Sequence, residues 1–148
     1  TATRPATAAD SARAGAPVPL RLATAVMALI AIVGIAIPLA AASLVRQSQS
    51  AALAGDQQGA LEDARSAQNV EPGAATPRLQ QALILEADAD FDSASAAALG
   101  ATAKEPTNWR NWLVLSRIEA ERGRASSAVT YYRRARSLNP HSSIFTSS

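Results

Sequence analysis

The chain has 148 residues, no cysteine, one histidine and a formal net charge of +2, and alanine supplies 36 of the residues. These counts exclude disulfides, thiol nucleophiles and metal sites built on cysteine or histidine. With six aromatic residues, a core has to be packed mainly from Ala, Leu, Ile and Val, which favours closely spaced helices over a β-sandwich. The charge is uneven: residues 1–46 carry four Arg against one Asp, residues 47–106 three basic against nine acidic side chains, and residues 107–148 seven Arg against two Glu.

Residues 1–21 are predicted to form a disordered or loop lead, because Ala, Thr and Pro dominate them without apolar periodicity. The chain begins with Thr1 and its one methionine is Met27. We therefore interpret the sequence as a fragment or a processed chain, so that chemistry can lie before Thr1.

Residues 22–45 form a run without a charged side chain between Arg21 and Arg46. As a helix the run is about 36 Å long, enough to cross a hydrocarbon core of about 30 Å, and we predict a transmembrane helix. Two alternatives stay open: a secretory signal, whose cleavage site fits residues 38–42, and a buried core helix. Three arginines precede the run and one follows it closely, which places the N-terminal flank in the cytoplasm and the rest of the chain on the outer side of the membrane.

Beyond residue 46 the sequence repeats with a period of about 34 residues, which is the length of a helix–turn–helix unit. Related positions are Pro72, Pro106 and Pro140; Gly55, Ala89 and Gly123; Ala60, Ala94 and Ala128; Ala64, Ala98 and Tyr132; and Ala67, Ala101 and Ala135. We predict three units, at about 41–74, 75–108 and 109–140. Their helix pairs are expected at 43–54 with 57–70, 77–88 with 91–104, and 109–122 with 125–138.

The last unit resembles the tetratricopeptide repeat. The residues that carry the resemblance are Trp112, Leu115, Ser116, Gly123, Ala128, Tyr132, Ala135 and Pro140. Gly123 permits a positive φ in the turn, and small residues let helices approach closely. The middle unit departs from the pattern at Arg78 and Ala98, and the first unit at Leu44 and Ala64, so we expect thinner packing in both. The predicted fold is all-α: one transmembrane helix that runs without a linker into about three tetratricopeptide-like repeats, an α-solenoid.

This arrangement is also similar to the C-terminal end of bacterial O-antigen ligase and polymerase-like membrane proteins. In that family the glycan chemistry lies upstream, so the resemblance implies no catalytic residue in this chain and leaves open an enzymatic longer parent. The alternative is a complete single-pass or secreted repeat protein that recruits partners for envelope assembly.

The tetratricopeptide resemblance implies a concave groove, lined by the first helix of each unit, that binds a protein or peptide. The register places these residues there: Thr76, Leu79, Leu83, Glu86, Arg110, Leu113, Arg117 and Glu121. Their mixed apolar and charged character suits an extended peptide or a helix. The groove lacks the Lys/Asn clamp that grips a C-terminal carboxylate in some repeats.

A second candidate binding surface is the arginine-rich last unit, with Arg133 and Arg134 beside two tyrosines. Guanidinium groups suit phosphates and carboxylates, which makes an anionic lipid or a glycan carrier a candidate partner. The alternative interpretation is a solvated helix face that opposes the acidic middle units. A nucleic-acid partner is not expected outside the cytoplasm.

No catalytic, metal or cofactor site is predicted. The acidic cluster Glu86, Asp88, Asp90 and Asp92 lacks the Gly and closing Glu of a calcium loop, and we interpret it as a solvated turn with Asp90 as a helix cap. Trp109 stays open between a packed position and an exposed groove edge or membrane interface. In the tail, residues 141–148, Ile144 and Phe145 are the large apolar side chains. A solenoid needs a cover over its last apolar face, which this tail or a partner has to supply.

Overall fold

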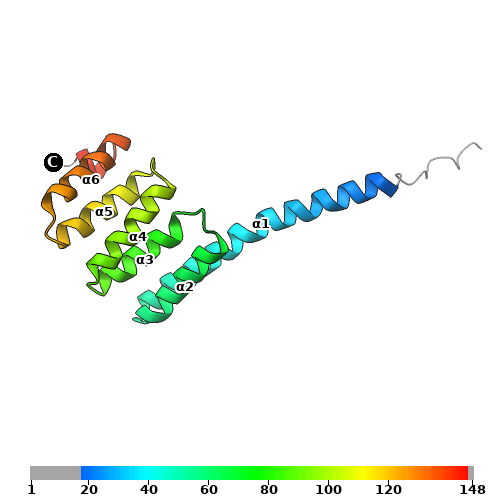
Figure 1. The fold of residues 1–148 in the computed structure, drawn as a ribbon, viewed down its shortest axis with the longest axis horizontal. Coiled ribbons are helices and arrows are strands. Elements are labelled where there is room, and N and C mark those ends of the chain that lie inside the picture. Colours follow the sequence, from blue (N-terminus) through cyan, green and yellow to red (C-terminus); the bar gives the residue numbers. More distant parts are fainter. Residues whose placement is uncertain (1–17, 147–148) are drawn as a thin grey trace, which may run out of the picture. The chain divides into compact units, whose positions relative to one another are not determined.

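The computed structural model describes residues 18–146, except for the side chains of residues 18–25, 28, 29 and 32 in the first helix. The described part of the chain is helical and has no strand (Figure 1). Its helices are α1 (Val18–Leu53), α2 (Gln57–Val70), α3 (Thr76–Ala87), α4 (Phe91–Lys104), α5 (Trp109–Glu121), α6 (Ala125–Leu138) and α7 (Ser143–Thr146). The chain divides into two compact units, one ending at Ile35 and one starting at Ala36. All helical hairpins belong to the second unit.

The structure gives little support to the predicted lead and membrane helix. Most of the lead over residues 1–21 lies outside the described residues, and α1 already begins at Val18. Among the described residues, no helix is long and apolar enough to span a membrane. The expectation of a transmembrane helix at 22–45 is therefore not supported. At its C-terminal end, Ala41 and Val45 are buried within the second unit, where they belong to the first hairpin.

The second unit is a solenoid of hairpins with the period predicted from the sequence. The second helices of the three hairpins start at Gln57, Phe91 and Ala125, so that each start lies one full period after the one before. Their ends, at Val70, Lys104 and Leu138, show the same step. Apart from the start of α1, the predicted helix bounds agree with the observed ones to within one position.

The turn within each hairpin has the same geometry three times. The backbone N–H of Asp56, Asp90 and Arg124 donates to the carbonyl five positions earlier, at 2.9, 2.9 and 2.8 Å. The residue before each donor has a positive φ: 84° at Gly55, 59° at Ala89 and 75° at Gly123. The turn imposes this conformation even where an alanine occupies the position, because the helix must end in the same αL residue to bring the second helix back.

Two apolar clusters form the core, one at each junction between hairpins. At the first junction, Ile84 of α3 packs against Ala60 and Ala64 of α2. At the second, Ile118 and Leu115 of α5 pack against alanines of α3 and α4, namely Ala82, Ala94 and Ala98. Ile84 and Ile118 are one period apart and are both almost completely buried, so each first helix places one isoleucine between the alanines of the preceding hairpin.

Within a hairpin the two helices approach closely at small residues. The Ser48 hydroxyl donates to the Ala60 carbonyl at 2.7 Å, and the Ser116 hydroxyl donates to the Ala128 carbonyl at 2.8 Å. A side chain as short as serine reaches the backbone of the other helix only where the two helices lie close together. The prediction that small side chains mark the close contacts is confirmed at these positions.

The sequence predicted thinner packing in the middle hairpin, but the position of Arg78 is filled in the structure. The half-buried Arg78 side chain lies against Gly100 of α4, where a Cβ would come within 3.1 Å of a guanidinium nitrogen. One period later the same two positions hold Trp112 and Arg134, and the Arg134 guanidinium lies 5.9 Å from the centroid of the Trp112 ring. In both hairpins an arginine side chain fills the space between these two positions. In the middle hairpin the long aliphatic stem of Arg78 occupies the volume that the Trp112 ring takes in the last hairpin.

The tail supplies the cover over the last hairpin. Helix α7 starts one period after α5, in the position of a further first helix. Its Phe145 is only 4% exposed and lies edge-on to Trp109 and Tyr132, with ring centroids 5.7 and 5.4 Å away. Trp109 is therefore a packed residue in this structure, since it sits under the tail.

Candidate functional site

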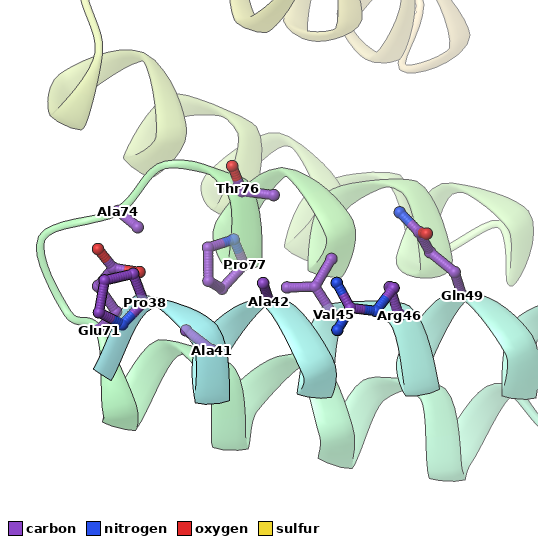
Figure 2. A pocket seen from close by; sticks show the side chains of 10 residues that line it. All are labelled: Pro38, Ala41, Ala42, Val45, Arg46, Gln49, Glu71, Ala74, Thr76 and Pro77. Atoms are coloured by element: carbon purple, nitrogen blue, oxygen red, sulfur yellow. The ribbon is translucent and has the colours of Figure 1, made fainter. Parts of the chain in front are cut away.

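A groove lies between α1 and α3 of the second unit and contains two pockets. Its first pocket, of about 290 Å³, is drawn in Figure 2 and is lined by Pro38, Ala41, Ala42, Val45, Arg46, Gln49, Glu71, Ala74, Thr76 and Pro77. Its second pocket, of about 440 Å³, is lined by Gln49, Ala52, Leu53, Gln57, Gln80, Leu83, Ile84 and Ala87. Gln49 belongs to both pockets, so they follow one another along the two helices.

The α1 wall of this groove was missed by sequence reasoning, although the period contains it. The groove positions predicted in the middle unit, shifted back by one period, are Ala42, Val45, Gln49 and Ala52. All four line one of the two pockets. The membrane helix predicted at 22–45 overlaps the start of this segment, and an uncharged run does not distinguish a groove wall from a lipid-facing helix.

The polar side chains of the second pocket are glutamines with few hydrogen-bond partners. Gln49 Nε2 donates to Gln80 Oε1 at 3.5 Å, the long end of the hydrogen-bond range, although Gln80 is only 8% exposed. Gln57 Oε1 is buried without a partner. A buried acceptor of this kind costs about 1–3 kcal/mol when it stays unpaired. The groove wall therefore holds amide groups whose bonding capacity the protein itself does not use.

Of the predicted groove residues, the structure brings only some together. Leu83 lines the second pocket, whereas the half-buried Leu79 lines neither pocket of the α1–α3 groove. Leu113 and Arg117 line a separate hollow of about 350 Å³ on the last hairpin, together with Val114, Ser116, Ala120 and Tyr132. Residues predicted for one groove thus line two hollows in the structure, one beside α1 and α3 and one on the last hairpin.

Arg117 is held by an ion pair across the junction between the last two hairpins. Its guanidinium donates to both carboxylate oxygens of Glu86, with Nε 2.7 Å from Oε1. The hydrogen bond to Glu86 raises the pKa of Arg117, against the opposing effect of burial. The Arg117 side chain is still 56% exposed, so it keeps one face toward solvent while its fork is occupied.

Arg122 forms a second link across the same junction. It donates to Glu119 and Ser95 and to Asp92, at distances of 2.5–3.0 Å. Burial by itself raises the pKa of Glu119, but hydrogen bonds from Ser95 and Arg122 outweigh it and hold the pKa below its usual range. The Arg122 pKa is raised by the hydrogen bonds to Glu119 and Asp92.

These contacts account for the acidic cluster in the turn between α3 and α4. Glu86 and Asp92 pair with arginines of the last hairpin. Asp90 caps α4 by accepting from the Ser93 N–H at 3.2 Å, and hydrogen bonds from Ser93 lower its pKa. Asp88 is exposed. Arg117 and Arg122 of the arginine-rich last unit therefore face acidic side chains of the middle unit. Among the described residues no group of acidic or histidine side chains has the arrangement of a metal site.

The other predicted binding residues lie on the surface of the last hairpin. Glu121 and Arg133 are at least partly exposed. Arg134 lies over the Trp112 ring, and the Arg110 guanidinium lies 4.8 Å from the Trp109 ring centroid. The tyrosines next to the arginine run serve packing: Tyr131 contacts Trp112 at 5.8 Å between centroids, and Tyr132 contacts the tail.

No known family model matches this chain, and no curated protein matches it. Solved structures do share its fold. MamA superposes with a TM-score of 0.64 at 16% identity over 68% of this chain. This chain spans 59% of MamA.

Two further structures match over more of their own length. The TPR domain of OM64 from Arabidopsis has a TM-score of 0.66 at 17% identity, with coverage of 73% of this chain and 89% of that domain. The first TPR of Spaghetti (RPAP3), bound to the HSP90 peptide SRMEEVD, has a TM-score of 0.68 at 15% identity, with 74% and 86% covered. At such identities the likeness shows the fold alone. The fold is an all-α, tetratricopeptide-like solenoid, and the comparisons do not show a link to O-antigen ligases.

Proposed function

We propose that this chain is a protein–protein interaction module that binds a segment of a partner protein in the groove between α1 and α3. The observation that carries the proposal is the groove itself, two consecutive pockets with a mostly apolar lining on a tetratricopeptide-like fold. At its edge Leu53 is 90% exposed and Leu83 is half-buried. A concave apolar site with a few polar groups is the usual form of a binding site, and its apolar lining gains free energy when a ligand covers it.

The mode of binding differs from capture of a terminal carboxylate. The one lysine of the chain, Lys104, ends α4 and does not line the groove. One structural neighbour is bound to an HSP90 peptide, which supports peptide binding as the activity of this fold type. The side chains in the present groove favour an internal segment of the partner over a chain terminus.

Charge placed at the groove edge tests the proposal. Random-peptide display on the immobilised full chain supplies ligands, whose affinities are measured by fluorescence anisotropy. Leu53→Glu should weaken the selected peptides about tenfold or more, because a carboxylate must then be desolvated beside apolar ligand groups. Leu99→Glu is the matched control, since Leu99 is half exposed on α4 and lies outside both pockets. If both variants bind like the wild type, the groove is not the binding surface.

We also propose, from the uncharged run at 22–45, that α1 attaches the module to the bacterial cytoplasmic membrane with the hairpins on the outer side. Large apolar side chains along α1 support this proposal: Val26, Met27, Ile30, Val33 and Ile35 are each about half exposed or more. Exposed apolar surface of this extent marks contact with a partner or a lipid phase. Alkaline carbonate extraction of the membrane fraction tests attachment, and protease accessibility in spheroplasts tests orientation. Release by carbonate would reject the anchor.

An origin in the C-terminal end of an O-antigen ligase or polymerase-like protein belongs to the same proposal. It requires further hydrophobic spans encoded upstream of Thr1. The genomic sequence decides between this parent and a single-pass or secreted protein for envelope assembly.

A further inference from the structure

The side chains along the groove indicate which kind of segment fits it. We propose that the α1–α3 groove takes an extended, uncharged, apolar peptide segment whose backbone amides pair with the side chains of Gln49, Gln57 and Gln80. This inference rests on the proposed function, because it specifies the ligand of the same groove.

The unused hydrogen-bonding capacity of the glutamines is the first observation. Gln80 is almost completely buried, and its side-chain oxygen accepts from Gln49 Nε2 over a long distance of 3.5 Å. Gln57 Oε1 has no partner at all among the described residues. Buried polar groups are nearly always paired in native proteins, so a ligand that donates an N–H to Gln57 Oε1 would satisfy this oxygen. The last torsion of a glutamine is broad, which lets each amide turn toward a bound ligand at low cost.

The need for backbone partners favours an extended ligand over a helical one. A helix uses its own N–H and C=O groups internally, so it offers side chains and few free amides to the groove. An extended segment presents an N–H or C=O at every residue. From Pro38 to Leu53, the groove follows α1 over about 22 Å, which matches roughly seven extended residues.

The lining also argues for a ligand without charge. None of the side chains around the second pocket is charged, and the first pocket has one arginine and one glutamate, Arg46 and Glu71. A charged ligand side chain would lose its hydration here without gaining a partner in the second pocket. The charged side chains lie instead at the next junction, where Arg117 and Glu86 already neutralise each other.

Three synthetic peptides test the ligand class on the full chain. The first is a fluorescein-labelled peptide of alternating Leu and Thr, the second has Glu in place of Thr, and the third is the first peptide N-methylated at alternate backbone positions. The first peptide should bind, with an affinity that changes little with added NaCl because no exposed ion pair is involved. The other two should bind about tenfold or more weakly, equivalent to roughly 1.4 kcal/mol or more. Equal binding of the N-methylated peptide, or no binding of the first peptide, would overturn the inference.

Glutamine variants show whether the amides make the contact. Gln57→Leu and Gln80→Leu should each weaken the first peptide about tenfold, while the melting temperature stays the same or rises, because a poorly paired amide is removed from the interior. Gln58→Leu is the matched control, since Gln58 is the exposed neighbour of Gln57 and lines neither pocket.

The same set of variants separates this inference from the proposed function. If Leu53→Glu abolishes peptide binding but the Gln57 and Gln80 variants bind normally, the groove binds peptides and amide recognition is rejected. If, instead, Leu53→Glu leaves the binding of the display-selected peptides unchanged, the groove itself is rejected as the binding site.

Discussion

The two junctions between hairpins have the same repeat geometry and different chemistry. At the first junction, Ile84 sits among alanines and the neighbouring polar groups are glutamines, which leaves the α1–α3 groove open. At the second junction, Leu115 and Ile118 fill the space between α4 and α5, and two arginines form ion pairs with the preceding hairpin. One repeat geometry therefore gives an ion-paired junction and a junction with an open groove, according to the side chains at equivalent positions.

The core isoleucines provide the largest expected difference between the junctions. Ile118→Ala should destabilise the chain by about 4 kcal/mol, because Ile118 is fully enclosed and its loss leaves a cavity. Ile84→Ala should cost about 2 kcal/mol, because Ile84 borders the second pocket and the space that it leaves opens to solvent. Urea unfolding of the two variants, followed by circular dichroism, measures both values. Equal losses would mean that the first junction is closed in solution.

Loss of the buried Glu119 carboxylate at the second junction should have the next largest effect on stability. Glu119→Ala leaves the Ser95 hydroxyl without its acceptor and is expected to cost about 1–3 kcal/mol. Because the folded-state pKa of Glu119 lies below its ordinary value of 4.5, its contribution is complete above pH 4.5 and is lost as the pH falls through the lowered folded-state pKa.

The acid dependence of stability gives the control. The melting temperature of the wild type should decline as the pH falls below the ordinary glutamate pKa of 4.5, and the decline should be shallower in Glu119→Gln, which no longer titrates there. Parallel pH curves for the two proteins would show that Glu119 does not couple folding to protonation.

The turn positions test whether the hairpins share one backbone. Gly123→Ala should destabilise by about 1 kcal/mol, because φ is 75° there, and Ala89→Gly should stabilise by a similar amount, because alanine is already held at 59°. Thermal melts of the two variants should therefore shift in opposite directions. A loss of stability in Ala89→Gly would show that the turn of the middle hairpin has a different requirement from the turn after α5.

The exposed ion pair between Arg117 and Glu86 should have the smallest effect. Glu86→Gln keeps the shape of the side chain and removes its charge, and we expect a loss of roughly 0.5 kcal/mol or less, because the guanidinium is more than half exposed and solvent screens the pair. The difference should shrink further in high salt. A loss several times larger, measured by chemical unfolding, would make this pair a main stabilising contact of the second junction.

The repeat architecture could be predicted from the sequence because the periodic residues act locally. Pro106 and Pro140 lie just after helices, Gly55 and Gly123 take the αL conformation in the turns, and alanines recur where backbones meet. Each of these residues restricts its own backbone or its nearest neighbour, so their regular spacing is sufficient to place helices and turns.

The site could be predicted only in part, because its members come from different hairpins. The register placed Leu83 in the groove, and one more step back would have added Gln49 and Ala52. It could not show that Arg117 turns to Glu86, or that Leu113 faces a separate hollow, because such contacts depend on rotamers and on how the hairpins stack.

The period, the helices and the turns of this protein follow from its sequence, since they depend on backbone preferences of single residues and on small side chains at close contacts. Which surface stays open depends on how the helices pack. Arg78 fills a place expected to be thinly packed, Phe145 covers the end of the last hairpin, and the glutamines of α1 and α3 meet across a groove. Those outcomes depend on side-chain volume and on pairing between segments that lie in different helices far apart along the chain, which a local pattern does not contain.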